Sequence, residues 1–319
     1  MARAFKGDAN AEASSFRNAG IVEINHGLTM AAMIYSTLFC HFYESVLSAA
    51  TEVDFSDEDE EITQMIVDEL ERSAFEPILI ADQSVGKWAT EGNVYAAHPL
   101  LIELPVRRTE NDYHTLVTAA ETFVVAHEFC HHMLGHTDEY FRHAGGAKKV
   151  VYQWLSQIDA DGIMEKLNSS QKQEVEADVA AFLLTCGLLS EGGSRPRVYR
   201  AVGGSMIALV ALAHVNQSWV SEGVSSTHPG VLERYEILAK IIKEITMRLP
   251  IGEEGKGHPI GFLIQFRGFI SVVLQTISSR MGGDVDPPSL LNIFSWMIDL
   301  EAEFKEEHKD YHRGEVEDS

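Results

Sequence analysis

Basic side chains are scarce in this 319-residue chain, which has 25 lysines and arginines against 48 aspartates and glutamates and a formal net charge of −23. Because nucleic acids and anionic membrane surfaces bind proteins through positive charge, this balance argues against both as partners. Cysteine is also rare, and Cys40, Cys130 and Cys186 are widely spaced within apolar helical patterns. With no CxxC pair, we expect reduced core thiols rather than disulfides, and a cytoplasmic location.

The chain also lacks an internal repeat, a phosphate-binding glycine loop and, after Met1, the continuous apolar segment of a secretory signal. Residues 201–220 contain no Asp, Glu, Lys or Arg, a length at the threshold for a membrane span. His214, Asn216 and Gln217 within this stretch favour a buried core helix, so no stable membrane insertion is expected. The 45% hydrophobic content is enough for a substantial globular core.

An HExxH pattern formed by His127, Glu128 and His131 is the most informative feature that is present. On an α-helix the two histidines lie one turn apart on the same face, so both imidazoles can bind one metal ion. Zinc accepts neutral nitrogen ligands, and three protein ligands leave its fourth position for water. Glu128 then lies where a general base for that water is needed.

The surrounding residues predict that this pattern lies on a buried helix. Thr109 and Asp112 have the spacing of an N-terminal cap, and Gly135 is a suitable helix end. Apolar residues recur between them at intervals of mostly three and four positions: Leu116, Val117, Ala120, Phe123, Val124 and Met133. Imidazoles and a carboxylate on the inner side of such a helix need a role, because unpaired buried polar groups are costly.

A metal site needs a third protein ligand, and the two histidines that follow at once do not suit it. For His132 and His136 to belong to a metzincin pattern, glycine would be required at Leu134 and histidine at Thr137. His136 is nine residues from His127, about half a turn away, so we expect it to face away from the metal if the helix continues.

A better third ligand lies in a second predicted helix. Ser170 and Gln173 have the spacing of a capping box, which would place Glu174 in the first turn. Glu174 and Asp178 share one face of this helix, and the alanines among residues 177–181 would let it pack closely on the first helix.

Taken together, HExxH at 127–131 and ExxAD at 174–178 resemble the gluzincin metallopeptidases of the HtpX and CAAX-prenyl-protease type. A His-Pro pair at 228–229, followed by Arg234, is similar to that family's downstream His-Pro motif and its arginine. The resemblance covers about residues 93–240 and is carried by short motifs. It is therefore informative about the site and says little about the substrate.

This resemblance implies a catalytic zinc centre with one Zn²⁺ per chain. The implied zinc ligands are His127, His131 and Glu174. Asp178 would orient a histidine ligand, and His228 would lie near the substrate oxyanion. Glu128 would accept the proton of the attacking water as general base.

The rest of the chain predicts a mainly helical α+β protein, in which a zincin-like core with a small β-sheet carries additional N- and C-terminal helices. Residues 77–81 and 95–106 are the strand candidates; they either pair with an extended substrate or only cover the core. Residues 20–50 fit one helix, or a strand followed by a helix, and residues 1–19 are expected to be loosely ordered. Residues 137–168 either cover the cleft or simply connect two helices.

We therefore divide the chain into an N-terminal helical region (1–74), a zinc metallopeptidase core (75–250) and a C-terminal helical layer with an acidic tail (251–319). Residues 54–61 contain six acidic side chains out of eight. A binding site for a cation or a basic partner is one interpretation of this run, and a solvated loop with a helix start is the one we adopt.

The sequence thus predicts a zinc-dependent endopeptidase acting on a protein or peptide substrate. One alternative is a catalytically inactive, zinc-stabilised binding or regulatory protein, which would have no evident need for Glu128. Another is an accidental HExxH match, which would require three independent coincidences along the chain. Neither the cleavage specificity nor the oligomeric state is defined by these motifs.

Overall fold

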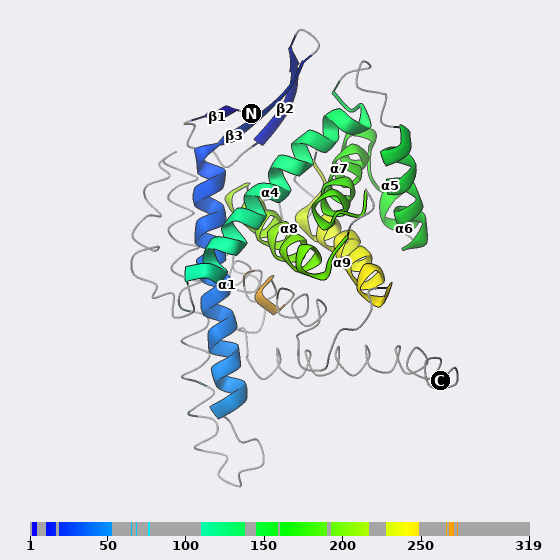
Figure 1. The fold of residues 1–319 in the computed structure, drawn as a ribbon. Helices are drawn as coiled ribbons and strands as arrows, with labels where there is room; N and C mark the ends of the chain where they lie inside the picture. Colours follow the sequence, from blue (N-terminus) through cyan, green and yellow to red (C-terminus); the bar gives the residue numbers. More distant parts are fainter. Residues whose placement is uncertain are drawn as a thin grey trace, which may run out of the picture.

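The protein is mainly helical and carries one small β-sheet (Figure 1), which confirms the predicted fold class. The computed structural model describes residues 2–4, 11–16, 19–52, 110–137, 145–158, 160–189, 193–216 and 228–248, with residues 65, 68, 76, 266, 268–270 and 273. The predicted domain boundaries, at residues 74/75 and 250/251, lie outside these stretches and stay predictions.

Three strands and seven helices have assigned bounds within the described residues. The strands are β1 (Ala2–Ala4), β2 (Ala11–Phe16) and β3 (Ala19–Asn25). The helices are α1 (His26–Glu52), α4 (Glu110–Leu134), α5 (Gly145–Gln157), α6 (Asp161–Met164), α7 (Ser169–Cys186), α8 (Arg195–Asn216) and α9 (Val231–Arg248). Residues 20–50 therefore form a strand followed by a helix, which was one of the two predicted arrangements.

The sheet has β3 at its centre, paired in parallel with β1 and antiparallel with β2. The expectation that residues 1–19 are loosely ordered is wrong for β1 and β2. Small polar residues have low strand propensity, so their side chains do not predict a strand. Backbone pairing with the more apolar β3 nevertheless supplies the hydrogen bonds that form one. The strand candidates at 77–81 and 95–106 lie outside the described residues.

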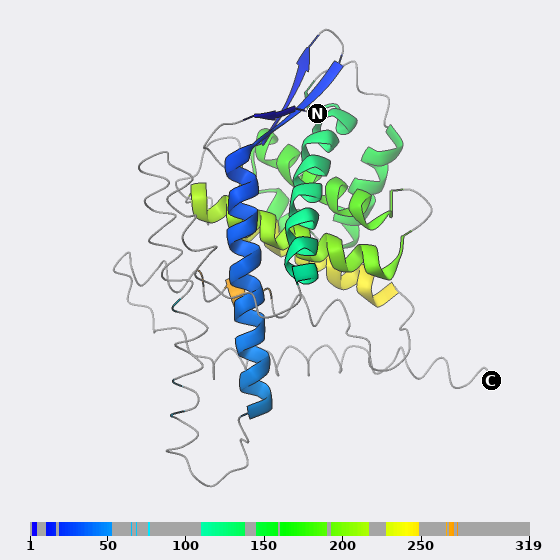
Figure 2. The same ribbon diagram turned by 60° about the vertical axis from the view of Figure 1, so that its left-hand side comes forward.

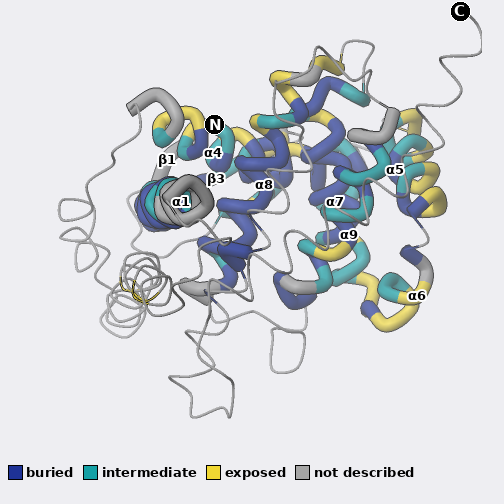
Figure 3. Tube along the Cα trace, turned by 90° about the horizontal axis from the view of Figure 1, so that it is seen from below, coloured by how far each residue is buried: buried dark blue, intermediate teal, exposed yellow. Residues whose placement is uncertain are grey.

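Helix α4 is the centre of the helical assembly and packs against α1, α7 and α8 (Figures 1 and 2). Helix α9 packs against α7 and α8, while α5 packs mainly against α7. Buried residues concentrate where α4, α7 and α8 meet (Figure 3), and most of the α8 side chains from Ala201 to Ala213 are inaccessible to solvent. The apolar stretch in 201–220 is thus part of a core helix as far as it is described, and none of the described helices is long and apolar enough to cross a membrane.

The three cysteines support the expected reduced thiols. Cys40, Cys130 and Cys186 are all buried and free of disulfide bonds. Burial raises the pKa of the Cys130 thiol to about 12, so this side chain behaves as a neutral core residue.

The crossing of α4 and α8 depends on a glycine. A Cβ atom added at Gly204 would overlap the backbone oxygen of Ala119 on α4. We expect Gly204→Ala to lower the free energy of unfolding by at least ~1–3 kcal/mol, the usual cost of overpacking, because the neighbouring atom is backbone and cannot rotate away. Urea unfolding measures this change.

Gly146→Ala is the matched control, since Gly146 lies in α5 with nothing within 4 Å of an added Cβ atom. Its replacement should be neutral or stabilising by about 0.5–1 kcal/mol, because alanine favours the helix. If Gly204→Ala unfolds at the same urea concentration as the wild type, α4 and α8 do not approach as closely as described.

Candidate metal centre

Helix α4 carries the HExxH residues and ends where the sequence predicts. Gly135 has a φ of 76°, a left-handed conformation that glycine adopts without strain. The backbone N–H of Gly135 donates to His132 O at 3.1 Å and that of His136 donates to His131 O at 2.8 Å. These two bonds satisfy the last carbonyls of the helix and turn the chain back beside it. The predicted N-cap, Thr109, lies outside the described residues.

Helix α7 begins two residues earlier than the predicted capping box. The N-cap is Asn168, whose side chain accepts a hydrogen bond from the Gln171 backbone at 3.0 Å, while the Gln171 side chain accepts one from the Asn168 backbone at 3.1 Å. Asparagine caps a helix as well as serine does, and Ser170 therefore lies inside the helix. Glu174 consequently occupies the second turn, where it faces α4.

The structure brings the three predicted ligands together. His127 Nε2 lies 3.3 Å from Glu174 Oε2, and His131 Nε2 lies 3.4 Å from Glu174 Oε1. The two Nε2 atoms are 3.1 Å apart. Among the described residues, this is the one group of three or more potential ligands whose donor atoms all lie within 4.8 Å of one another. Two imidazole nitrogens and one carboxylate oxygen form the donor set of a catalytic zinc site, so the residues fit that metal.

The charges within this cluster balance each other. Burial alone would lower the pKa of His127, but hydrogen bonding to Asp178 and Glu174 outweighs it and raises the pKa to about 10. His131 differs: burial and the nearby charge of His127 lower its pKa to about 3. Burial would raise the pKa of Glu174, yet the contact with His127 holds it at about 2. The opposite shifts of His127 and Glu174 both reflect the contact between these two side chains.

Asp178 is held from two sides and in turn fixes His127. Arg234 on α9 donates to both carboxylate oxygens, from Nε at 2.6 Å and from a terminal nitrogen at 2.7 Å. His127 Nδ1 lies 2.9 Å from Asp178 Oδ1. All three side chains are buried, and Arg234 overcomes the effect of burial to keep the pKa of Asp178 below its usual range. The His127 ring therefore has Asp178 at its Nδ1 atom and Glu174 at its Nε2 atom.

Glu128 is buried beside the cluster and does not belong to it. Burial raises the pKa of its carboxyl group, and the charge of His127 partly opposes that effect. The backbone amide of Ala13 on β2 also hydrogen-bonds to this carboxylate. Ala13 cannot be identified from sequence alone, because a contact between an N-terminal strand and a helix more than a hundred residues later leaves no local pattern.

His228 lies at the accessible side of the cluster. Its Nε2 atom is 3.5 Å from Glu174 Oε2, and about half of its side chain, 51%, is exposed. Pro229 is buried at the entrance to α9, and the Gln171 side chain donates to the His228 carbonyl at 3.4 Å. Burial nevertheless lowers the pKa of His228. The ring is positioned to reach a group bound next to Glu174.

His132 and His136, the two histidines that follow the HExxH residues, have different surroundings. His132 faces the sheet, with Nε2 3.2 Å from Ile21 O and Nδ1 2.8 Å from Thr137 Oγ1. The placement expected for His136 assumed a continuing helix, but the helix ends at Gly135 and the chain turns back; His136 nevertheless stays outside the ligand group. His136 Nδ1 lies 3.1 Å from His131 Nδ1, on the opposite side of that ring from Glu174.

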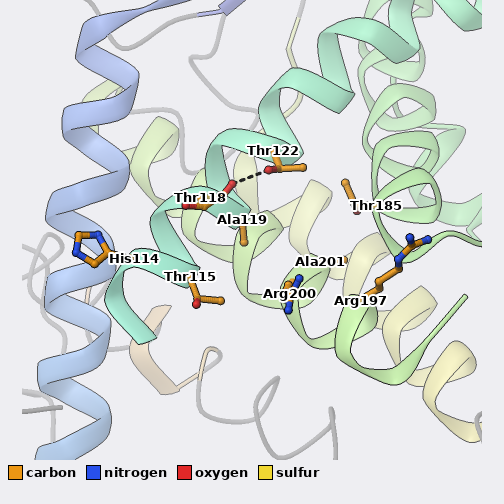
Figure 4. A pocket seen from close by; sticks show the side chains of 9 residues that line it. All are labelled: His114, Thr115, Thr118, Ala119, Thr122, Thr185, Arg197, Arg200 and Ala201. Carbon is orange, nitrogen blue, oxygen red and sulfur yellow. Dashed lines mark hydrogen bonds between the residues drawn. The ribbon is translucent and has the colours of Figure 1, made fainter. Parts of the chain in front are cut away.

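Two hollows elsewhere on α4 do not include these residues. One, of about 520 Å³, lies between α4, β3 and the end of α7 and is lined by apolar residues that include Phe129 and Leu184. The other, of about 420 Å³, lies between α4 and α8 and is lined by threonines with Arg197 and Arg200 (Figure 4). None of the predicted ligands, nor Glu128 or His228, lines either hollow.

The chain belongs to the peptidase U49 family, because the model of that family matches residues 32–246, more than half of the sequence. The matched region runs from α1 into α9 and includes every residue of the cluster described above. Neither a curated protein nor a solved structure matches the chain. Family membership makes this protein a peptidase.

Proposed function

We propose that this peptidase is a zinc-dependent endopeptidase of the gluzincin type, similar to HtpX and the CAAX prenyl proteases. The supporting observation is the convergence of His127, His131 and Glu174 ligand atoms within 4.8 Å. This group has the composition of a catalytic zinc site, and its two helices come from widely separated parts of the sequence. A carboxylate outside the ligand set, Glu128, lies directly beside it.

In this proposal, some residues bind the metal and others transfer protons. When bound, zinc supplies a Lewis acid that brings the pKa of water close to neutrality. Glu128 accepts the proton from that water at its carboxylate and can release it to the leaving amine, since burial raises the pKa of Glu128 toward the working range. Asp178 holds the ring of His127 in place throughout.

His228 completes the proposed catalytic group. Its ring lies on the exposed side of Glu174, where a substrate carbonyl would enter, and it can hydrogen-bond to the oxygen on which negative charge develops. The buried Pro229 holds the histidine backbone at the start of α9 and restricts its conformation.

Strand β2 is the proposed docking edge for the substrate. It pairs with β3 along one side, and no described strand pairs with its other side. The Ala13 amide of β2 reaches Glu128, so a peptide added along this strand would run close to the proposed catalytic carboxylate. Backbone pairing would hold the peptide extended with little demand on its sequence, and the acidic surface favours basic or neutral substrates.

The alternative of an inactive zinc-stabilised protein shares every ligand with this proposal. Glu128 separates the two, because a structural site needs no buried carboxylate outside its ligand set. Such a group is costly to bury, and proton transfer explains its place beside the ligands.

Zinc content is the direct test of the metal centre. We expect protein purified without chelator to contain about one zinc per chain, and Glu174→Ala to lose most of it because one of three ligand bonds is removed. Atomic emission measures the content, and competition with a chromophoric chelator measures the affinity.

His132→Ala is the matched control, since His132 faces the sheet and should leave zinc affinity close to that of the wild type. Wild-type protein that holds no transition metal and takes up no added zinc would refute the proposal. Equal affinity in Glu174→Ala and the wild type would show that Glu174 is not the third ligand.

A further inference from the structure

We infer that His136, Glu176 and Tyr152 form a hydrogen-bonded relay that sets the position and tautomer of the zinc ligand His131. The inference rests on the proposed zinc function and deepens it. His127 has Asp178 as its outer partner, and the relay is the separate and longer counterpart for the second histidine.

The relay starts on the far side of the His131 ring. His131 Nε2 faces Glu174 at 3.4 Å, while His131 Nδ1 lies 3.1 Å from His136 Nδ1. The helix end at Gly135 makes this contact possible, because the left-handed turn brings the next residue back onto α4. The two rings lie 5.1 Å apart between centroids at an angle of 68°, so they meet edge to face rather than stacking.

Beyond His136 the relay continues into two other helices. His136 Nε2 lies 3.2 Å from Glu176 Oε2 on α7, and the Tyr152 hydroxyl on α5 donates to Glu176 Oε1 at 2.6 Å. The side chains of His136 and Glu176 are only 4% and 8% exposed. A carboxylate this deeply buried needs hydrogen bonds to both oxygens, and these two neighbours supply them.

The direction of every bond in the relay follows from the orientation of His131. A neutral imidazole has one protonated and one bare nitrogen, and only the bare nitrogen can bind a metal. With Nε2 directed at the ligand cluster, the proton of His131 is on Nδ1 and is donated to His136. The bare Nδ1 of His136 places its own proton on Nε2, which donates to Glu176. The ionised Glu176 carboxylate therefore accepts one hydrogen bond from His136 and one from Tyr152, so each group acts at that contact only as a donor or only as an acceptor.

The relay also gives residues 137–168 a defined task. Tyr152 is on α5, within residues 137–168. The sequence allows two roles for this segment: it covers the cleft, or it only connects two helices. Lys148 on the same helix lies 5.8 Å from the centre of the Tyr152 ring, a cation–π contact that keeps the phenol in place. Helix α5 thus connects α4 to α7 and also supports the metal centre from outside.

Zinc affinity of conservative variants tests the relay in the full-length protein. Glu176→Gln removes the charge and one acceptor oxygen without changing size, and we expect it to weaken zinc binding about 10- to 100-fold, as outer-shell changes do. Tyr152→Phe should produce a smaller loss in the same direction. Glu165→Gln is the matched control, because it removes the same charge from an exposed turn after α6. Equal zinc affinity in Glu176→Gln and Glu165→Gln would overturn the relay.

A second measurement does not depend on zinc. Long-range ¹H–¹⁵N spectra of histidine-labelled protein, with and without chelator, report which ring nitrogen carries the proton, and a His136→Ala spectrum assigns the signals. We expect neutral His136 to have its proton on Nε2, and this preference to be lost in Glu176→Gln. A proton on Nδ1, or one divided between both nitrogens as in a free ring, would overturn the relay even if the protein binds zinc. Absence of zinc from a wild-type protein with the expected tautomer would instead refute the proposed function.

Discussion

Glu128→Gln is expected to bind zinc with wild-type affinity and to hydrolyse a peptide substrate at least ~100-fold more slowly, the typical loss when a positioned general base is removed. The carboxylate is buried next to the ligand cluster without contributing to it, so an amide of the same size leaves the metal bonds intact. Cleavage of a peptide library, followed by kinetics on the best sequence, measures the loss, and zinc content is determined on the same sample.

Glu121→Gln provides a control on the same helix. Glu121 accepts a hydrogen bond from Thr29 on α1 at 2.6 Å and lies almost two turns before Glu128, outside the cluster. Its replacement should leave turnover unchanged. A zinc-loaded Glu128→Gln protein that cuts at the wild-type rate would show that another group accepts the proton.

His228→Ala separates proton transfer from charge stabilisation. This variant should also keep its zinc, and its kcat/KM should fall by up to ~1000-fold if the ring contacts the oxyanion. The two substitutions together should cost less than the sum of the separate losses in activation free energy, because both act on one transition state.

A sequence can reveal those parts of the site whose residues lie close together along the chain. His127 and His131, like Glu174 and Asp178, are pairs four residues apart whose shared face follows from helix geometry alone. Arg234 could be connected to Asp178 only through family resemblance, since 56 residues separate them. The geometry then shows the role of the arginine, which neutralises a buried carboxylate that also contacts His127.

The missed residues depend on where elements end and how distant ones meet. The period of a continuing helix cannot locate His136, because a single left-handed residue at Gly135 turns the chain back toward His131. Ala13 and Tyr152 come from a strand and a helix whose packing against α4 and α7 is set by the whole core. Propensity also pointed away from β2, whose small and polar residues become a strand through pairing with β3.

Arg234→Met is expected to lower the free energy of unfolding by about 3–5 kcal/mol, because it leaves Asp178 ionised and buried without its charge partner. The guanidinium donates to both oxygens of this carboxylate, and both side chains are buried. Urea unfolding of the metal-free protein measures the change, since bound zinc would add its own stabilisation to the native state.

The double variant Arg234→Met with Asp178→Leu distinguishes the structural role of this pair from its role at the metal. Removing both charges should recover most of the lost stability, because an apolar pair of similar volume replaces a buried ion pair at little cost. The remaining loss comes from His127, whose Nδ1 no longer has a carboxylate 2.9 Å away. Zinc affinity should therefore stay about 10- to 100-fold below that of the wild type even when stability returns. Recovery of both properties would mean that Asp178 balances Arg234 and does not orient the ligand. Recovery of neither would mean that the fold needs the ion pair itself, and only the predicted split between stability and zinc affinity supports an orienting role for Asp178.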